Sequence, residues 1–324
     1  MIRFLSFLAI LAMVYVLPVG LKAAGAPFKE IGTSGLTEAY YPVGQAIIKV
    51  FDRQEEQRDF RLYIEPSSGA RENIDRVVAG HWDFGIARGD LLYQAEHSSG
   101  LWQGQPQPQL RAIAALYPEA VTMMAAVDTG IKSLGDLRGK RVSIGVEGSG
   151  DPENMRGLLR MVGLNPEKDL EVRLLGPVDS ADQLQKGDVD AYCLTIGHPN
   201  LALIEASSGT RKMRIIEFEA ETIRRIKAQA PYFVDTMIQV KYYPNLENST
   251  NVATIGAKAT LFTLATTPDA EVAAILNSIL GNFKLFRNQH PALQQLKPQD
   301  LATGLALPLH PGAEEVYQKR GLLP

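Results

Sequence analysis

The sequence contains almost no cysteine: Cys193 is the single one among 324 residues. One thiol cannot form a disulfide within the chain, so packing alone must hold the fold. Cys193 lies in the apolar run 191–194, which predicts a small buried core residue. A reactive thiol is the less favoured interpretation, because no histidine or other base stands beside it in a known motif.

Basic residues form no dense block, and the formal net charge is −3. This balance argues against nucleic acid as the main partner. Hydrophobic residues make up 45% and charged residues 21% of the chain, which is an ordinary globular composition. The length is sufficient for two lobes with separate cores.

Motifs of common catalytic sites are also missing. The sequence has no Gly-x-Ser-x-Gly elbow, no Gly-x-x-x-x-Gly-Lys-Ser/Thr loop and no Gly-x-Gly-x-x-Gly fingerprint. The histidines show no zinc-binding spacing; they are His81, His97, His198, His290 and His310. We therefore expect a protein that is not an enzyme and that has no cofactor and no metal.

Long apolar runs are absent except at the N-terminus. Residues 1–26 have the pattern of a secretory signal peptide: a basic start, an apolar run from Phe4 to Val19, and small residues at the end. An uncleaved anchor is the alternative, but the run is shorter than the roughly 20 residues that span a bilayer, and Pro18 and Lys22 close it. We expect export to the periplasm and a soluble mature chain, tethered at most at its start.

After the signal segment, short apolar strands alternate with amphipathic helices, which is typical of α/β architecture. We expect strands at 28–32, 60–65, 84–87, 141–146, 171–175 and 191–196, and helices at 42–53, 70–79, 151–162, 181–186 and 269–289. Asp151 is expected to cap the helix that it opens.

One local pattern occurs twice. A glycine that can end a helix is followed three residues later by an aspartate and a buried strand, at Gly80–Asp83 and at Gly187–Asp190. Such a sequence is also a common way to leave a helix. With the matching strand, glycine turn and helix upstream, it predicts two similar lobes: lobe I from residues 27–118 and 256–324, and lobe II from residues 119–255.

Three glycine-rich turns precede helices, at 32–35, 67–69 and 148–150. Free backbone N–H groups at a helix start attract anions, and small residues allow an anion to come close. Each turn alone is explained better as a helix cap or tight turn, because such caps are common. Three such turns at the carboxyl ends of strands favour one binding cleft between the lobes.

Other polar residues stand near these turns. Tyr40 and Tyr41 follow the first turn and could contact a ligand or pack on the helix start. Arg88 follows a strand and could pair with a ligand carboxylate, remain in solvent or form an internal ion pair. Glu147 borders the third turn and could bind an amine or face water, and His198 ends another strand and could close the cleft wall.

Seven stretches, in order along the chain, carry a resemblance to a known family. They are 31–35 (IGTSG), 40–44 (YYPVG), 67–73 (SSGAREN), 110–120 (LRAIAALYPEA), 130–145 (GIKSLGDLRGKRVSIG), 148–150 (GSG) and 308–314 (PLHPGAE). They resemble the TAXI family of TRAP-transporter substrate-binding receptors. The resemblance implies a type II periplasmic-binding-protein fold, two α/β lobes with a ligand cleft between them, and delivery to a sodium-coupled TRAP membrane permease. It also implies a small acidic ligand such as glutamate or 2-oxoglutarate.

The chain departs from the family pattern at three positions. Arg88-Gly89-Asp90 stands where the family often has a segment like Gln-Ser-Asp, Asp151 where threonine is common, and Glu147 where a small residue or proline is common. Arg88 would favour an additional carboxylate on the ligand. Glu147 and Asp151 would oppose one, unless the ligand carries an amine.

We expect a monomeric receptor whose cleft closes on a carboxylate or amino-acid ligand. In this interpretation Thr33, Ser34 and the backbone of Gly35 bind an anionic group. The other expected ligand-binding residues are Tyr40, Tyr41, Ser68, Arg88, Glu147, Ser149, Asp151 and His198. Two alternatives are an enzyme on the same fold and a receptor subunit that feeds a membrane sensor.

Overall fold

The computed structural model describes residues 26–36, 38–53, 59–147 and 150–323. The predicted signal peptide lies outside the described residues, except for Ala26. Within the described ranges, every helix is too short or too polar to cross a membrane. The fold is mixed α/β, as the alternating sequence pattern predicts.

The strands form one sheet in the order β2-β1-β3-β10-β4-β7-β5-β6, with β8 beside β4 and β9 beside β10. They are β1 (Phe28–Gly32), β2 (Arg61–Glu65), β3 (Phe84–Arg88), β4 (Leu110–Ala126), β5 (Arg141–Ser143), β6 (Glu171–Arg173), β7 (Ala191–Ile196), β8 (Met213–Ile215), β9 (Phe233–Ile238) and β10 (Val252–Leu264).

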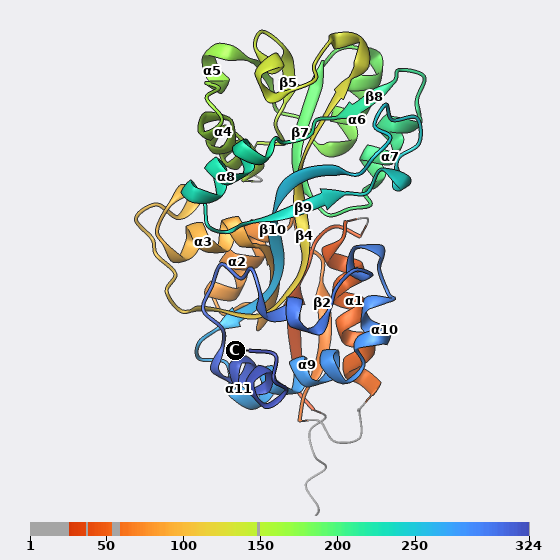
Figure 1. Cartoon of the computed structure of the whole chain (residues 1–324). Coiled ribbons are helices and arrows are strands. Elements are labelled where there is room, and N and C mark those ends of the chain that lie inside the picture. Colours follow the sequence, from red (N-terminus) through yellow and green to blue (C-terminus); the bar gives the residue numbers. More distant parts are fainter. Residues whose placement is uncertain (1–25, 37, 54–58, 148–149, 324) are drawn as a thin grey trace, which may run out of the picture.

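Two long antiparallel strands, β4 and β10, run from one half of the molecule into the other (Figure 1). β4 pairs with β10 over residues 110–120 and with β7 over residues 120–125. β10 pairs with β9 over residues 252–257 and with β3 over residues 259–263. β4 changes partners at residue 120 and β10 at residues 257–259, and residues 117–120 of β4 pair with residues 256–259 of β10. The two strands therefore join two smaller sheets into one.

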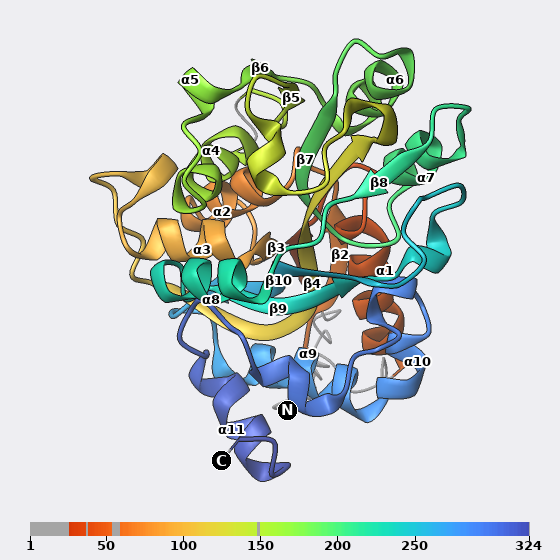
Figure 2. The same ribbon diagram turned by 45° about the horizontal axis from the view of Figure 1, so that its top comes forward.

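Helices pack on the sheet in both halves of the molecule (Figure 2). They are α1 (Tyr40–Phe51), α2 (Ala70–Val78), α3 (Gly89–Glu96), α4 (Asp151–Met161), α5 (Pro166–Asp169), α6 (Pro177–Lys186), α7 (Leu201–Ser208), α8 (Ala220–Gln229), α9 (Asp269–Gly281), α10 (Phe283–Arg287) and α11 (Pro311–Lys319). We call β1–β3, α1–α3 and α9–α11 lobe I, and β5–β9 with α4–α8 lobe II.

Each lobe has hydrophobic cores of its own. In lobe I, one core lies beneath α1, α9 and α11, and a second lies beneath α2 and α3. In lobe II, one core lies beneath α4 and α8, and another beneath α6 and α7. The prediction for Cys193 is confirmed, because its side chain is fully buried in a lobe II core and this burial raises the pKa of the thiol. The lobe boundaries at 118/119 and 255/256 stay a prediction.

The repeated glycine and aspartate have a structural role, first visible in lobe I. Gly80 follows α2 with a φ of 71°, a left-handed conformation that glycine adopts without strain. Three residues later, Asp83 accepts hydrogen bonds from Nζ of Lys29 at 2.9 Å and from the backbone N–H of Glu30 at 3.1 Å. The aspartate thereby fixes the start of β1 beside the start of β3.

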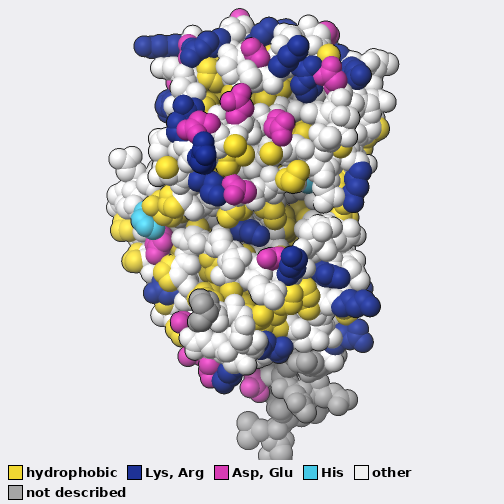
Figure 3. Space-filling view, viewed as in Figure 1, with side chains coloured by type: hydrophobic (Ala, Val, Ile, Leu, Met, Phe, Trp, Pro, Cys, Tyr) yellow, Lys and Arg dark blue, Asp and Glu magenta, His cyan; other side chains and the backbone are white. Residues whose placement is uncertain are grey.

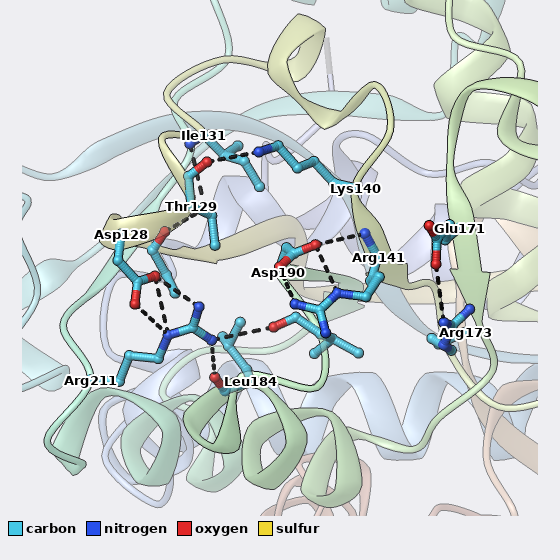
Figure 4. A network of polar contacts seen from close by, with 12 residues as sticks. Asp128, Thr129, Ile131, Lys140, Arg141, Glu171, Arg173, Leu184, Asp190 and Arg211 are labelled. Carbon is cyan, nitrogen blue, oxygen red and sulfur yellow. Dashed lines mark hydrogen bonds and ion pairs between the residues drawn. The ribbon is translucent and has the colours of Figure 1, made fainter.

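Lobe II repeats this arrangement (Figure 4). Gly187 ends α6 with a φ of 85°, and Asp190 accepts a hydrogen bond from the backbone N–H of Arg141 at 2.9 Å and one from its Nη2 at 2.6 Å. Nearby, Arg211 donates to Asp128 at 2.8 Å. Each lobe thus uses an aspartate to hold the first strand of its sheet.

Three predictions about helix ends are wrong. The helix expected at 181–186 begins at Pro177, a residue suited to the first helical position. The helix expected at 269–289 is broken at Asn282, whose φ of −118° and ψ of 31° are not helical. Gly281 and Asn282 are both weak helix formers. The Asn282 side chain and its backbone N–H both donate to the carbonyl of Ser278, which ends α9 there. Asp151 is the first residue of α4 rather than its cap, because Gly150 precedes it in a left-handed conformation with a φ of 90°.

Charged side chains of both signs are interspersed over the face of the molecule in Figure 3. This distribution fits the small net charge of the chain.

Candidate ligand-binding cleft

A cavity of about 420 Å³ lies between the lobes, within the range of roughly 300–1,000 Å³ that is usual for small-molecule sites. Lobe I contributes the segments that open α1 and α2 and the end of β3. Lobe II contributes the segments that open α4, α6 and α7 and the end of β7. The middle of β4 forms the floor. The cavity therefore lies at strand ends and helix starts, and of the three predicted turns the second one lines it, through Ser68 and Gly69.

The start of α2 shows why the chain needs glycine in this wall. Gly69 has a φ of 106° and a ψ of −157°, a region that is open essentially only to glycine. The neighbouring Ser68 is bonded to the carboxylate of Glu72, through its N–H at 3.0 Å and its hydroxyl at 2.9 Å. These bonds lower the pKa of Glu72 and order the turn that borders the cavity.

The floor is formed by Tyr117 and Glu119 on β4, with Arg88 at the end of β3 beside them. Glu119 is 6% exposed, and its burial raises the pKa of the carboxyl to about 8, although the Arg88 guanidinium and a hydrogen bond from Tyr40 favour the ionised form. Three buried polar atoms here have no hydrogen-bond partner among the described residues: Nη2 of Arg88, Oη of Tyr117 and Oε1 of Glu119.

Arg88 joins the two lobes. Its Nε donates to Asp90 at 2.7 Å within lobe I. Its Nη1 crosses to lobe II, where it donates to Asp151 at 2.8 Å and to the backbone carbonyl of Thr195 at 3.0 Å. Two of its three nitrogens are therefore engaged with protein groups, and Nη2 remains for a ligand.

Further polar contacts connect α3 of lobe I to α4 of lobe II. Asn154 donates to Asp90 and accepts from Gln94, each at 2.5 Å. On the same side, the ring of Tyr93 lies 5.1 Å from the ring of Tyr232 in lobe II. Together with Arg88, these contacts hold the lobes against each other on the α3 side of the cavity.

On the opposite side of the cavity, Gly197 allows a close approach. A Cβ at this position would lie 2.8 Å from the ring of Tyr117 and 3.5 Å from Cβ of Ala39, which precedes α1. The end of β7 thus fits against lobe I only because residue 197 has no side chain.

Four of the predicted residues come together in the cavity: Tyr40, Ser68, Arg88 and Asp151. Glu147 lies apart from them, in a more open hollow of about 740 Å³ on the outer face of α2, which Ser68 also borders. Ser149 lies outside the described residues.

The residues of the first turn are not in the cavity lining. Thr33 and Ser34 are buried, and their hydroxyl groups have partners within lobe I. The Thr33 hydroxyl donates to the carbonyl of Glu65 at 2.8 Å, and the Ser34 hydroxyl accepts from the N–H of Tyr41 at 3.3 Å. Gly35 and Tyr41 are half-buried at the same turn. Both hydroxyl groups therefore make bonds within lobe I, and anion binding by this turn stays a prediction.

His198 lies behind the cavity wall rather than in it. Its Nε2 is 2.7 Å from the hydroxyl of Thr122, and its Nδ1 is hydrogen-bonded to the hydroxyl of Tyr243. Burial lowers the pKa of the ring to about 3, so the histidine is neutral and connects β7 to β4.

Sequence reasoning missed Glu38, Tyr117 and Glu119. Glu38 lies between the first turn and α1, close to Tyr40 and Tyr41, and no sequence pattern distinguishes it from a solvent-exposed glutamate. Glu119 had a visible signal, because a lone carboxylate interrupts an apolar strand, and a buried carboxylate needs a specific reason.

Comparisons with known proteins agree with this architecture. The model of the NMT1-like family matches residues 31–321. A solved structure from Bordetella bronchiseptica RB50 superposes with a TM-score of 0.54 at 15% identity, covering 91% of this chain and 98% of that one, and it supports the fold.

Two further solved structures superpose with TM-scores of 0.48. One is the periplasmic aliphatic sulphonate binding protein SsuA from Escherichia coli, with 15% identity over 92% of this chain and 79% of that one. The other is the probable amino-acid ABC transporter extracellular-binding protein ytmK from Bacillus subtilis, with 15% identity over 81% of this chain and 95% of that one.

Proposed function

The chain belongs to the NMT1-like family, and we propose that it is an exported solute-binding receptor that captures a small polar metabolite between its lobes for a membrane transporter. The observation that carries this proposal is the cavity walled by both lobes, with three unpartnered polar atoms at its floor. A buried polar atom without a partner costs about 1–3 kcal/mol, so a ligand that supplies partners gains affinity.

The contacts between the lobes support a mechanism of closure. Arg88, Asp90 and Asn154 connect α3 to α4 across the cleft, and Gly197 allows the opposite side to meet Tyr117. A solute bound at the floor would contact both lobes at once and would therefore favour the closed form over an open one. The transporter would recognise that form. In this proposal the lobes are residues 27–118 with 256–324, and residues 119–255.

The finer part of the proposal concerns the transporter and the ligand. The resemblance of seven stretches to TAXI receptors supports a sodium-coupled TRAP permease as the partner. It also supports a ligand with a carboxylate, of the size of glutamate or 2-oxoglutarate. Arg88 and Tyr117 can each donate one hydrogen bond to such a carboxylate.

Thermal-shift measurements test the receptor function. The mature chain, without residues 1–26, is screened against amino acids, keto acids and dicarboxylates. A ligand at a hundred times its Kd stabilises the folded state by about 2.7 kcal/mol, which raises the melting temperature. Small-angle scattering of the same samples should show a smaller radius of gyration with the ligand. A chain that no solute stabilises would contradict the proposal.

The transporter part has a separate test. Vesicles that contain the candidate TRAP permease should take up the solute only when the receptor and a sodium gradient are both present. Uptake that needs ATP instead would replace the TRAP partner and leave the receptor function standing.

A further inference from the structure

The charges that line the cleft are mostly negative. The negative charges come from Glu38 and Asp151, since burial raises the pKa of Glu119, the third acidic residue of the lining, to about 8. Among the described lining residues the basic side chains are Arg88 and His290. Arg88 is already paired with Asp151 and with Asp90 behind it. Burial lowers the pKa of His290, so its ring is neutral at pH 7. Among the described residues, the lining of the cleft thus carries no positive charge that is not already balanced.

Two of these carboxylates belong to opposite lobes. Glu38 precedes α1 in lobe I, and Asp151 opens α4 in lobe II. Both carboxyl groups line the same cavity, from opposite lobes. Partial burial and the charge of Asp151 raise the pKa of Glu38, which is the effect expected of two like charges that face one cleft. A positive charge between them would replace this repulsion with attraction.

The floor offers a different chemistry. Nη2 of Arg88 and Oη of Tyr117 are donors, and both are buried without a partner. They suit one acceptor group, such as a single carboxylate. The remaining wall is largely apolar, with Leu91 of lobe I and Leu201 and Ile204 of lobe II among its residues. Apart from His290, whose pKa is lowered by burial, the described part of this wall has no basic side chain for a second carboxylate on the ligand.

We propose that the solute is a zwitterion with a protonated amine and an uncharged side chain: the amine lies between Glu38 and Asp151, and the carboxylate faces Arg88 and Tyr117. The inference rests on the proposed receptor function. It keeps the carboxylate and the size proposed above, but it replaces glutamate and 2-oxoglutarate with amino acids that have no second carboxylate. It selects amino acids with apolar or neutral polar side chains over keto acids and dicarboxylates.

Matched pairs of solutes test the need for the amine. Leucine and 4-methyl-2-oxopentanoate share a carbon skeleton, as do phenylalanine and phenylpyruvate, and glutamate and 2-oxoglutarate. Calorimetry gives Kd for each at low ionic strength and pH 7. We expect the tightest ligand to be an amino acid with an uncharged side chain, and to bind roughly tenfold to a hundredfold tighter than its keto analogue.

Variants of Glu38 and Asp151 test whether these two carboxylates cause the preference for an amine. Glu38→Gln should reduce the ratio between amino acid and keto acid about tenfold. Asp151→Asn should reduce it further, because it also releases Nη1 of Arg88 for a carboxylate. Glu153→Gln is the matched control: this carboxylate is exposed on the same turn of α4 and lies outside the cleft lining, so the ratio should not change.

The outcomes separate the two proposals. Keto acids or dicarboxylates that bind as tightly as amino acids would overturn the zwitterion and leave the receptor function standing. An amine preference that persists in both Glu38→Gln and Asp151→Asn would also overturn it. Absence of binding by every solute class would overturn both.

Discussion

Glu119 is a buried carboxyl group within an otherwise apolar strand, and its pKa differs strongly from the ordinary value. Groups from four elements face it: Tyr40 from α1, Arg88 from β3, Asp90 from α3 and Asp151 from α4. Burial dominates over the Arg88 guanidinium and the Tyr40 hydrogen bond, so the pKa of this carboxyl lies at about 8, above the ordinary 4.5. The carboxyl is therefore mainly protonated at neutral pH.

This shift predicts a pH dependence of stability. The folded protein holds a proton on Glu119 up to about pH 8, whereas the unfolded chain releases it near pH 4.5. Stability contributed by this group is therefore complete below pH 4.5 and is lost as the pH rises toward 8, by up to about 1.4 kcal/mol per pH unit. Urea unfolding of the ligand-free protein between pH 5 and pH 8 measures the loss.

Glu119→Gln supplies the comparison, because the amide has a similar shape and does not titrate. The variant should show a flatter dependence over this range. If the two proteins lose stability in parallel, the Glu119 carboxyl is not protonated in the folded state.

Residue chemistry in the site could be predicted from sequence only in part. Tyr40, Ser68, Arg88 and Asp151 were found because they stand at strand ends and helix starts, which local patterns reveal. The partners of Arg88 could not be found, since Asp151 and Thr195 are 63 and 107 positions away along the chain. Only the folded chain shows that this arginine connects the lobes.

At the scale of elements, the contact between the end of β7 and lobe I depends on one missing side chain. Gly197→Ala would place a Cβ 2.8 Å from the buried ring of Tyr117, which cannot move aside without disturbing the core. We expect a loss of affinity of at least about tenfold, with a destabilisation of about 1–3 kcal/mol. Calorimetry and urea unfolding measure the two effects.

Gly157→Ala is the matched control. Gly157 lies within α4 of the same lobe, and an added Cβ would meet no atom within 4 Å. This change should leave affinity unaltered and stabilise the helix slightly. Equal loss of affinity in both variants would show that the contact at Gly197 has no role in closure.

Helices and strands could be predicted where a strong local signal marks them. Their ends could not be predicted where a contact with a distant segment determines them. The strands and helices of the repeated units lie where the sequence predicts them, to within a few residues. Asp83 and Asp190 mark the strand starts that they bind. The strand expected at 141–146 ends at Ser143, because its pairing with β6 and β7 stops there. The length of this pairing depends on the register of the neighbouring strands, which hydrophobic periodicity in one segment does not reveal.

At the scale of the whole molecule, the shared strands couple the lobes. Both tryptophans, Trp82 and Trp102, lie in lobe I, so their fluorescence reports on that lobe, whereas far-ultraviolet circular dichroism reports on both. Because β4 and β10 are continuous through the two lobes, we expect the lobes to unfold together. The fluorescence and dichroism curves in urea should therefore coincide, and a separate second transition by dichroism would contradict this coupling.

The two crossing strands also restrict how the chain can vary in length. Side chains alternate between the faces of a strand, so one residue inserted in β4 between Tyr117 and Ala120 would exchange inward and outward positions in one lobe relative to the other. The same holds for β10 between Ala257 and Ala259. Relatives of this chain should therefore tolerate insertions in many surface loops but keep the number of residues in these two short segments constant.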